Sequence, residues 1–318
     1  MLDSEIMDLS TDMVGFWRTE TIAAAVRLNL FDHVPGTLLD IAAHTKLPKM
    51  HLERLLRALW ELDLVFLEDQ TWQLSSRGKL LSPKSENFLM AASVMWSDIN
   101  SSIWKRLPER IKTGFDTYHA VFKALAADER LQVYHRAIDG YTALDASVFV
   151  NAIDWKEHHT VIGVERNSKV FLEKLLESQL HLQGMLLGDQ YIMKHINLTK
   201  TLVSRYVLKA HDLLEPWGES ADAIIFPKVL HFWPDAEALQ ILKYARHALL
   251  PGGKIYLFEM LLSKESPAGS LLDLNILVET GGKLRFLSDW KELFSAAKLT
   301  LRESKIVCSD INLLVLEA

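Results

Sequence analysis

The C-terminal half of the chain alternates short, continuous apolar runs with segments of helical periodicity, and this pattern constrains the fold more than any other feature. The apolar runs cover residues 160–164, 184–187, 205–208, 221–226 and 254–259, and helical segments at 170–178 and 236–249 lie between them. Strands that are apolar along their whole length are typical of a parallel sheet covered by helices on both faces. We therefore predict a Rossmann-like α/β domain over residues 156–318.

The residues that close these apolar runs are where we expect ligand chemistry. In an open parallel sheet, ligands bind beyond the carboxyl ends of the strands. The residues at the strand ends are Glu165, Gly188, Asp189, Asp212, Pro227, Lys228 and Glu259. Because most of them are charged, the sequence predicts a polar site at this edge of the sheet.

The first 87 residues show a different pattern, three helical segments followed by two short strands. Apolar residues recur at helical spacing over 14–33, over 37–44 and from 48 to 62. Strand-like runs at 64–68 and 71–74 flank a two-residue turn. This order predicts a mainly helical winged-helix domain over residues 1–87.

Nucleic acid is the alternative partner for a winged helix. The segment that would be the recognition helix carries Lys49, Arg54 and Arg57, but Glu53 and Glu61 offset these charges. Sequence-independent affinity for DNA needs several uncompensated cations on one face, and the net charge of the whole chain is −6. We therefore expect this domain to contact protein and not nucleic acid.

A third segment, residues 88–155, contains several amphipathic helices that are rich in aromatic residues. We expect helices over 88–95, 99–111, 120–125 and 131–150. The aromatic residues are Trp96, Trp104, Phe115, Tyr118, Phe122, Tyr134, Tyr141 and Phe149. Packing in a core or a dimer interface is the simpler interpretation, and the alternative is that some of them line a pocket for a flat apolar ligand.

Composition excludes several classes of protein. The N-terminus has no cationic start followed by an apolar run, and no segment is apolar over the roughly 20 residues that a membrane span needs. The single cysteine, Cys308, rules out an internal disulfide framework. None of the 12 histidines stands at a recognised metal-binding spacing. We expect a cytoplasmic protein with no membrane partner and no metal site.

Several motifs resemble those of the small-molecule O-methyltransferases that use S-adenosylmethionine (SAM). The most specific is KVLHFWPD at 228–235, followed by IL at 241–242 and ALLPGGK at 248–254; GFW at 15–17, LLRAL at 55–59 and GGK at 281–283 also fit. The resemblance covers nearly the whole chain from about residue 14. It implies a winged-helix dimerisation domain, a class I methyltransferase domain, a homodimer and a small natural-product-type substrate from secondary metabolism, with aromatic molecules among the candidates.

The resemblance also implies a catalytic pair. In the family, the histidine of the 228–235 motif takes a proton from the substrate hydroxyl and a glutamate after the next strand orients it; these residues are His231 and Glu259, 28 positions apart. A histidine bonded to a carboxylate is a general base suited to neutral pH. The alternative is that His231 caps a helix and Glu259 is a solvated strand end. Phe232 and Leu284 stand where the family has carboxylates.

The resemblance breaks at the loop after the first strand. The family has a glycine-rich loop there, since the backbone approaches the cofactor closely, whereas this chain has IGVERNSK at 162–169. We expect the carboxylate of Glu165 to repel the cofactor's carboxylate, and Arg166 and Lys169 to fill the space of its amino-acid portion. The two cations, with Trp233, become candidates for binding substrate.

The adenosine side of the site is also altered. The family's ribose-binding acid falls on Gly188, so only Asp189 could replace it. Asp212 matches the acid that helps to hold adenosine, and Lys228 lies next to the position of a lysine near it. Asp189, Asp212 and Lys228 are therefore cofactor-binding residues only if SAM binding is retained.

These departures lead us to predict an enzyme that uses no cofactor. His231 and Glu259 would then run SAM-independent acid–base chemistry, a cyclisation, elimination, decarboxylation or hydrolysis. The first alternative is a SAM-dependent O-methyltransferase with a divergent cofactor loop. The second is a non-catalytic binding or partner protein, against which the retained His231 and Glu259 argue. The identity of the substrate is not readable from the sequence.

Overall fold

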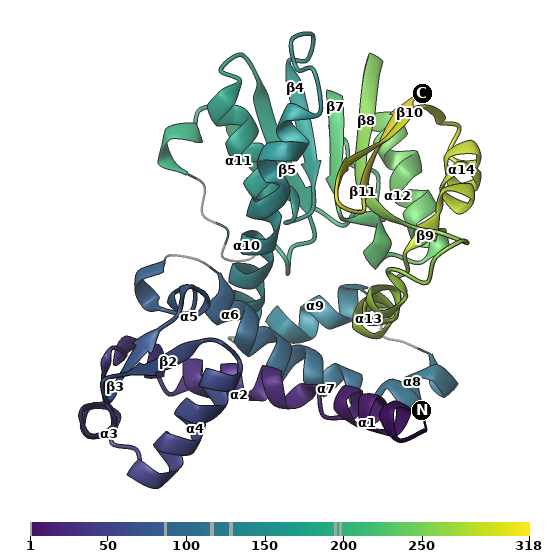
Figure 1. The fold of residues 1–318 in the computed structure, drawn as a ribbon. Helices are drawn as coiled ribbons and strands as arrows, with labels where there is room; N and C mark the ends of the chain where they lie inside the picture. Colours follow the sequence, from purple (N-terminus) through teal and green to yellow (C-terminus); the bar gives the residue numbers. More distant parts are fainter. Residues whose placement is uncertain (1, 86–87, 115–117, 127–129, 194–195, 197–198) are drawn as a thin grey trace. The chain divides into compact units, whose positions relative to one another are not determined.

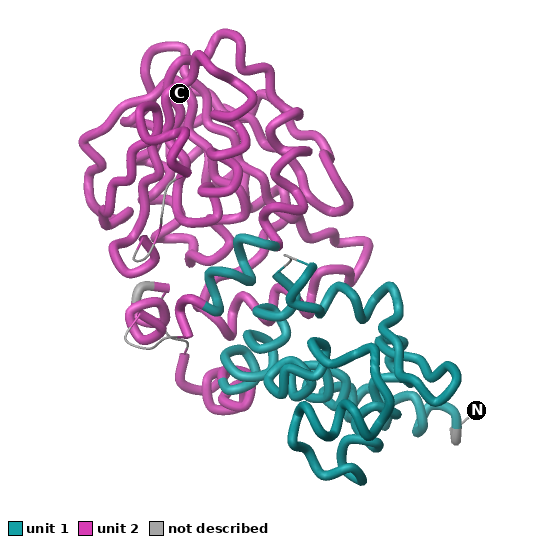
Figure 2. Tube along the Cα trace, turned by 90° about the vertical axis from the view of Figure 1, so that its left-hand side faces the viewer, with its two compact units in different colours: residues 1–102, 133–140 teal, residues 103–132, 141–318 magenta. Residues whose placement is uncertain are grey.

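The computed structural model describes residues 2–85, 88–114, 118–126, 130–193, 196 and 199–318. Contacts divide the chain into two compact units, which are coloured separately in Figure 2. Unit 1 comprises residues 1–102 and 133–140, and unit 2 comprises residues 103–132 and 141–318. The long helix α10 (Arg130–Asn151) contributes residues to both units, and the three-segment division suggested by the sequence stays a prediction.

The first part of unit 1 consists of helices and a small sheet that contains a hairpin. The helices are α1 (Leu2–Met13), α2 (Phe16–Arg27), α3 (Leu38–Thr45), α4 (Lys49–Glu61) and α5 (Ser76–Lys79), with short 3-10 turns at Leu30–Asp32 and Pro83–Ser85. The strands β1 (Gly36–Thr37), β2 (Val65–Glu68) and β3 (Thr71–Leu74) form an antiparallel sheet in the order β1-β3-β2. The predicted order of helices and hairpin is observed, whereas α1 and β1 were not anticipated.

Local chemistry explains the boundaries and the core of this unit. The Thr37 hydroxyl accepts the Asp40 N–H, and the Asp40 carboxylate accepts the Thr37 N–H, so a reciprocal capping box begins α3. Along α4, Leu52, Leu56 and Leu59 recur at intervals of four and three residues and are fully buried. They join the core that fixes the hairpin against the helices.

The helices that follow are more broken than the sequence predicts. They are α6 (Leu89–Val94), a π-helical segment (Met95–Asn100), α7 (Ser101–Trp104), α8 (Leu107–Thr113) and α9 (Tyr118–Ala126). The predicted continuous helix over 99–111 is wrong, because Pro108 at the start of α8 has no N–H to continue the ladder from α7. Among the predicted aromatics, Tyr118, Phe122, Tyr134 and Phe149 are buried, and Phe115 lies outside the described residues.

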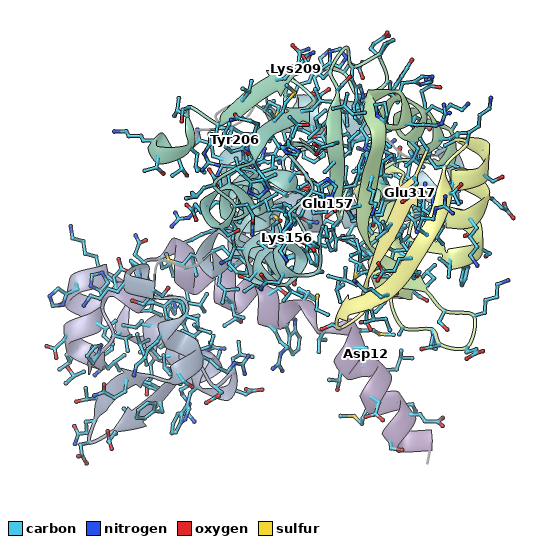
Figure 3. All side chains as sticks on the ribbon, turned by 90° about the horizontal axis from the view of Figure 1, so that it is seen from above. Asp12, Lys156, Glu157, Tyr206, Lys209 and Glu317 are labelled. Atoms are coloured by element: carbon cyan, nitrogen blue, oxygen red, sulfur yellow. The ribbon has the colours of Figure 1, made fainter. Side chains whose placement is uncertain are left out.

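Unit 2 is built on one large sheet of mixed direction. Its strands are β4 (Thr160–Val164), β5 (Gln183–Gly188), β6 (Tyr206–Ala210), β7 (Ala221–Pro227), β8 (Leu249–Leu262), β10 (Thr300–Cys308) and β11 (Ile311–Glu317), in the order β10-β11-β8-β7-β4-β5-β6; β9 (Arg285–Phe286) pairs with β8. The strands β4 to β8 run parallel, as predicted, and β10 and β11 form an antiparallel pair at one edge. Figure 3 labels Tyr206 and Lys209 on β6, and Glu317 on β11 across the sheet.

The helices that follow β4 are α11 (Ser168–Ser178), α12 (Asp235–Ala248), α13 (Ser270–Thr280) and α14 (Leu287–Ala296), with 3-10 turns at Lys200–Leu202 and Leu230–Phe232. Helix α13 contacts α9 and the turn at Leu230–Phe232. Helix α11 packs against β4, β5 and β7, while α12 contacts β8 and α14 contacts β10. Figure 1 shows α12 and α14 beside the antiparallel edge. This α/β arrangement confirms the predicted fold class. Within the part of the chain that the structure describes, no helix is long and apolar enough to cross a membrane.

The strand order places a topological switch point between β4 and β7. The chain leaves β4 toward β5 and β6 on one side, and β7 leads to β8 on the other. At such a point the loops beyond the carboxyl ends of the two strands diverge, which is where α/β sheets bind ligands. The residues beyond β4, β5, β7 and β8 are therefore the ones to consider together.

Candidate active site

His231 and Glu259 come from neighbouring parallel strands and contact each other. His231 lies in the 3-10 turn after β7, and Glu259 lies in β8, which runs parallel to β7. The distance between His231 Nδ1 and Glu259 Oε2 is 2.7 Å. The other carboxylate oxygen of Glu259 accepts the backbone N–H of Leu230 at 2.9 Å. Both oxygens of a carboxylate with 0% exposure are therefore used to hold the histidine and its turn.

This geometry determines which nitrogen of the ring is free to react. A carboxylate beside Nδ1 accepts a hydrogen bond from the N–H of that nitrogen, so the neutral ring carries its lone pair on Nε2. No described residue forms a hydrogen bond with Nε2 of His231. The ring is 6% exposed and lies 4.3 Å from the ring of Phe232. A buried carboxylate thus fixes the orientation of a histidine ring that has one nitrogen open, a geometry suited to general-base chemistry.

A buried arginine that sequence analysis missed holds the turn around His231. Arg285, in β9, is 0% exposed. Its guanidinium donates to the Leu230 carbonyl at 3.0 Å, to the Trp233 carbonyl at 2.7 Å and to Asp235 Oδ1 at 2.9 Å. Two donors of one planar group thus fix the backbone on both sides of His231, and the third binds the Asp235 side chain. No sequence signal singled it out, because arginine is usually a surface residue.

The segment before Arg285 also contacts the turn. The Lys283 N–H donates to the His231 carbonyl at 2.8 Å. A Cβ on Gly282 would lie only 2.1 Å from the same carbonyl oxygen, so a residue without a side chain is needed for this approach. The Gly-Gly-Lys motif noted in the sequence therefore acts by packing backbone against backbone behind the histidine.

Aromatic rings gather beside the base. The ring of Tyr118 lies 4.4 Å from that of Trp233 and 5.9 Å from that of Phe232. Trp233 is buried, and its indole N–H has no hydrogen-bond partner among the described residues. An unused buried donor next to a general base is a group that a polar ligand atom can satisfy. The structure thus places Trp233, a predicted substrate-binding residue, in the same group as His231.

Beyond β4, Glu165 adopts an unusual conformation. Its backbone φ is 62°, in the left-handed region that favours glycine, and its side chain is 2% exposed. Oε1 accepts the Asp189 N–H at 3.1 Å, and Oε2 has no hydrogen-bond partner among the described residues. Burial raises the pKa of this carboxyl to about 8, although the Asp189 N–H and the nearby Tyr118 phenol act to lower it. The group is therefore largely protonated at neutral pH.

The two cations of the loop have different surroundings. Lys169 is directed along its own helix, where Nζ pairs with Glu173 Oε2 at 2.7 Å. Arg166 is largely buried in the loop itself. The side chain of Asn167 donates to the Lys228 carbonyl at 2.7 Å, which joins the loops beyond β4 and β7 across the switch point. The sequence-based expectation that Lys169 extends into a ligand space is not met, because Glu173 one turn away holds its ammonium group.

The remaining predicted residues lie on separate loops of the same edge. Asp189 accepts the Tyr191 N–H at 2.7 Å, and Asp212, which is exposed, accepts the Leu214 N–H at 2.9 Å. Lys228 has a positive φ of 58° and pairs with Asp145 at 2.5 Å. Each carboxylate thus caps its own turn, and the ammonium of Lys228 is already neutralised. Within the described residues, no group of three or more potential ligands could hold a metal ion.

Comparison with known proteins places both parts of the chain. Residues 193–299 match the family model described as the O-methyltransferase domain, and residues 12–83 match the O-methyltransferase dimerisation domain. Phenazine O-methyltransferase PhzM of Lysobacter antibioticus is 25% identical over 317 residues, which cover 95% of this chain and 93% of the relative. The 2,7-dihydroxy-5-methyl-1-naphthoate 7-O-methyltransferase of Streptomyces carzinostaticus is 26% identical over 316 residues, 93% of this chain and 92% of the relative.

Solved structures share the fold across the whole chain. The crystal structure of human N-acetylserotonin methyltransferase in complex with SAM has a TM-score of 0.85 and 19% sequence identity, and the match covers 98% of this chain and 97% of that one. The sheet and the N-terminal helices described above are therefore those of this group of structures.

Proposed function

This chain belongs to the O-methyltransferase family that carries a dimerisation domain, and from that premise we propose that it is a SAM-dependent O-methyltransferase acting on a small hydroxylated aromatic molecule. The observation that carries the proposal is the buried pair of His231 and Glu259, in which Nε2 stays open beside aromatic rings. A base of this kind serves to take the proton of a substrate hydroxyl.

The predicted SAM-independent reaction and the predicted absence of a cofactor are wrong. Relatives that align over nearly the whole chain are O-methyltransferases, and the similar human structure was solved with SAM. The prediction failed because it treated the missing glycines as a blocked site. It assumed a charged Glu165 and an extended Lys169, whereas the carboxyl is buried with a raised pKa and the lysine is paired with Glu173.

The residues beyond β4 and β5 fit a bound SAM. Because the pKa of Glu165 is raised to about 8, the carboxyl is mostly neutral at pH 7 and the expected repulsion of the cofactor's carboxylate is largely absent. Its Oε2 is a buried polar atom that has no partner among the described residues, and a ligand hydroxyl, which can both donate and accept, could satisfy it. Asp189 and Asp212, on the loops beyond the next two strands, would contact the adenosine side.

Each residue of the catalytic pair has a distinct task in the proposed reaction. When bound, SAM supplies a methyl group on a positively charged sulfur. Glu259 holds the ring of His231 in one tautomer and balances the positive charge that the ring gains. Nε2 accepts the hydroxyl proton as the substrate oxygen becomes the nucleophile, and Arg285 keeps the turn in place while this occurs.

The surroundings of His231 favour a flat aromatic substrate. Tyr118, Phe232 and Trp233 offer ring faces, and the Trp233 N–H offers a donor for a polar substituent. If the substrate carries an anionic group, Arg166 is a better candidate to bind it than Lys169, whose ammonium is engaged by Glu173. The ammonium of Lys228 is paired with Asp145, so we expect Lys228 to act through its backbone carbonyl, which accepts the Asn167 side chain and holds the two loops together near the adenosine.

We also propose a homodimer formed by the dimerisation domain. Large apolar side chains are exposed on α1 and α2, namely Ile6, Met7, Leu9, Met13, Phe16 and Trp17. An apolar surface of this kind on helices marks a protein–protein interface. Gel filtration with light scattering tests the state: a monomer at micromolar concentration would contradict it.

The function is tested by methyl transfer to a panel of hydroxylated aromatic compounds. Purified protein is incubated with SAM and each compound, and formation of S-adenosylhomocysteine (SAH) and of methylated product is followed by mass spectrometry. His231→Ala should abolish product formation, whereas His247→Ala, which alters an exposed histidine on α12, should not. If calorimetry detects no binding of SAM or SAH, the proposed function is overturned.

A further inference from the structure

At the carboxyl ends of β4 and β5, a glycine and an acid stand in exchanged positions. The loop after β4 begins with Glu165 where close backbone approach calls for a glycine, and β5 ends with Gly188 where nucleotide-binding sheets place an acid about 20 residues after that loop. The two positions are neighbours, because the Glu165 N–H donates to the Leu187 carbonyl at 2.7 Å. One substitution can therefore compensate for the other.

The side chain of Glu165 occupies the space that a side chain at 188 would enter. A Cβ built on Gly188 would lie 3.0 Å from Oε2, 3.2 Å from Cα and 3.3 Å from Cδ of Glu165. The carboxyl is anchored there, because Oε1 accepts the N–H of Asp189, the residue that follows Gly188. The acid thus comes from β4 but lies at the end of β5.

This placement is costly for the folded protein by itself. A non-glycine residue at φ 62° is strained, and strain of this kind concentrates at functional sites. Burial of a carboxyl with only one oxygen satisfied adds a desolvation cost. A residue that served only to pack the core would need neither the positive φ nor the unpaired carboxyl oxygen. A glycine would remove the strain, and an apolar residue would remove the desolvation cost.

We propose that Glu165 replaces the acid missing from position 188 and that its Oε2 forms a hydrogen bond with a ribose hydroxyl of the bound adenosyl cofactor. The inference rests on the proposed function, because it assumes that an adenosyl ligand binds. In sheets of this kind the acid at the end of the second strand bonds to the ribose. With Oε1 committed to Asp189, Oε2 is the oxygen left for the hydroxyl.

Calorimetry with two probes tests this role, SAH and its analogue without the ribose 2′- and 3′-hydroxyls. The wild-type protein should bind SAH about 10- to 100-fold more tightly than the analogue, the range expected for losing a charge-assisted or buried hydrogen bond. Glu165→Gly should lower the affinity for SAH by about the same factor and leave the affinity for the analogue nearly unchanged. It should not lower the melting temperature, because glycine relieves the positive φ.

The exchange of both residues provides the sharper variant. Glu165→Gly combined with Gly188→Glu returns the acid to β5 and the glycine to β4, so it should restore most of the preference for SAH. Asp63→Gly is the matched control: it also replaces an acid at positive φ, here 56°, but in unit 1, and it should leave SAH binding unchanged.

The outcomes separate the inference from the function beneath it. If the wild-type protein binds neither SAH nor SAM, the proposed function itself is overturned. If the wild type binds SAH and Glu165→Gly retains both the affinity and the preference over the analogue, the ribose role is overturned. Should Glu165→Gly fail to fold, Gly188→Ala applies instead: its Cβ would displace Oε2, so it should weaken SAH more than the analogue, and equal binding of the two would refute the role.

Discussion

The sheet of unit 2 carries two buried histidines beside carboxylates, one at the carboxyl ends of the parallel strands (the carboxyl edge) and one at their amino ends (the amino edge). The two pairs differ in whether a ring nitrogen of the histidine lacks a hydrogen-bond partner among the described residues. At the carboxyl edge, His231 uses Nδ1 to contact Glu259, and no described residue bonds to Nε2. At the amino edge, His158 contacts Tyr256 Oη through Nε2 at 2.8 Å and lies 3.4 Å from Asp222 through Nδ1. Both histidines are buried to a similar degree.

The comparison shows that burial beside a carboxylate does not by itself identify a catalytic base. Asp222 is engaged by backbone, because it accepts the N–H groups of His159 and Thr160 where β4 begins. With both ring nitrogens committed, His158 links β4, β7 and β8 and has no lone pair to offer. His231 differs in one respect, an open nitrogen, and it lies at the edge where α/β sheets bind ligands.

The strongest test of this contrast exchanges the two histidines for alanine. His231→Ala should lower kcat by about 10²- to 10⁴-fold, the usual contribution of a general base. His158→Ala should leave kcat within about threefold of wild type but lower the melting temperature, because Tyr256 and Asp222 lose a buried partner. Steady-state kinetics and thermal unfolding measure both. Equal loss of kcat in the two variants would break the comparison.

We expect a smaller loss of kcat when Glu259 is replaced by glutamine, which has the same shape but no charge. Glu259→Gln can still accept the Leu230 N–H, but it no longer offers a charge to the ring of His231. We expect kcat to fall by about 10- to 100-fold with KM nearly unchanged, since the interaction strengthens only as the ring becomes charged. Asp222→Asn is the matched control at the amino edge, and a comparable loss of kcat there would contradict the assignment.

The sequence predicted some parts of the fold and of the site and missed others. The apolar run at 160–164 coincides with β4, and the parallel order follows from helices between such runs. The pairing of His231 with Glu259 was implied by the family resemblance, and the neighbouring strands β7 and β8 bring the two residues together. The antiparallel pair β10 and β11 was not anticipated, and neither was the role of Arg285. A burial of 0% for an arginine depends on three acceptors that only the fold assembles.

Glu165 shows why the site was harder to predict than the fold. Its identity is visible in the sequence, but its effect depends on the direction of one side chain and on its protonation. The residue next to a missing glycine was expected to repel a ligand as an anion, whereas the side chain lies against Gly188 and burial raises its pKa. Local sequence does not specify either quantity, because both depend on neighbours from β5.

The two edges should also respond to pH in opposite directions, and Glu165 should give the larger response. Its pKa is raised from 4.5 to about 8, so the folded state holds a proton that the unfolded state has released over this range. The stabilising contribution is complete below pH 4.5 and is lost as the pH rises through 8. The free energy of unfolding therefore declines over this pH range, and Glu165→Gln should remove on the order of 2 kcal/mol of the decline. Denaturant unfolding from pH 5 to 9 measures it, and parallel curves for both proteins would exclude a buried, protonated Glu165.

At the amino edge the sign reverses and the effect is smallest. Burial lowers the pKa of His158 below the usual histidine value of 6.5, and Lys254 acts in the same direction, while Asp222 and Glu157 oppose them. The folded state therefore resists protonation where the unfolded state takes up a proton. The contribution is present above pH 6.5 and is lost as the pH falls toward the folded pKa, with a slope below the single-group ceiling of about 1.4 kcal/mol per pH unit.

His158→Gln should flatten the decline in the free energy of unfolding between pH 6.5 and 5, and exposed His247→Gln should leave that decline as it is. The reason is that a histidine whose neutral form is held by the fold takes up a proton on unfolding, so acidification lowers the free energy of unfolding. Denaturant unfolding at several pH values measures both slopes. If His158→Gln and wild type lose stability equally on acidification, His158 is not held neutral, and the amino-edge pair would be an ordinary ion pair instead of a fixed structural link.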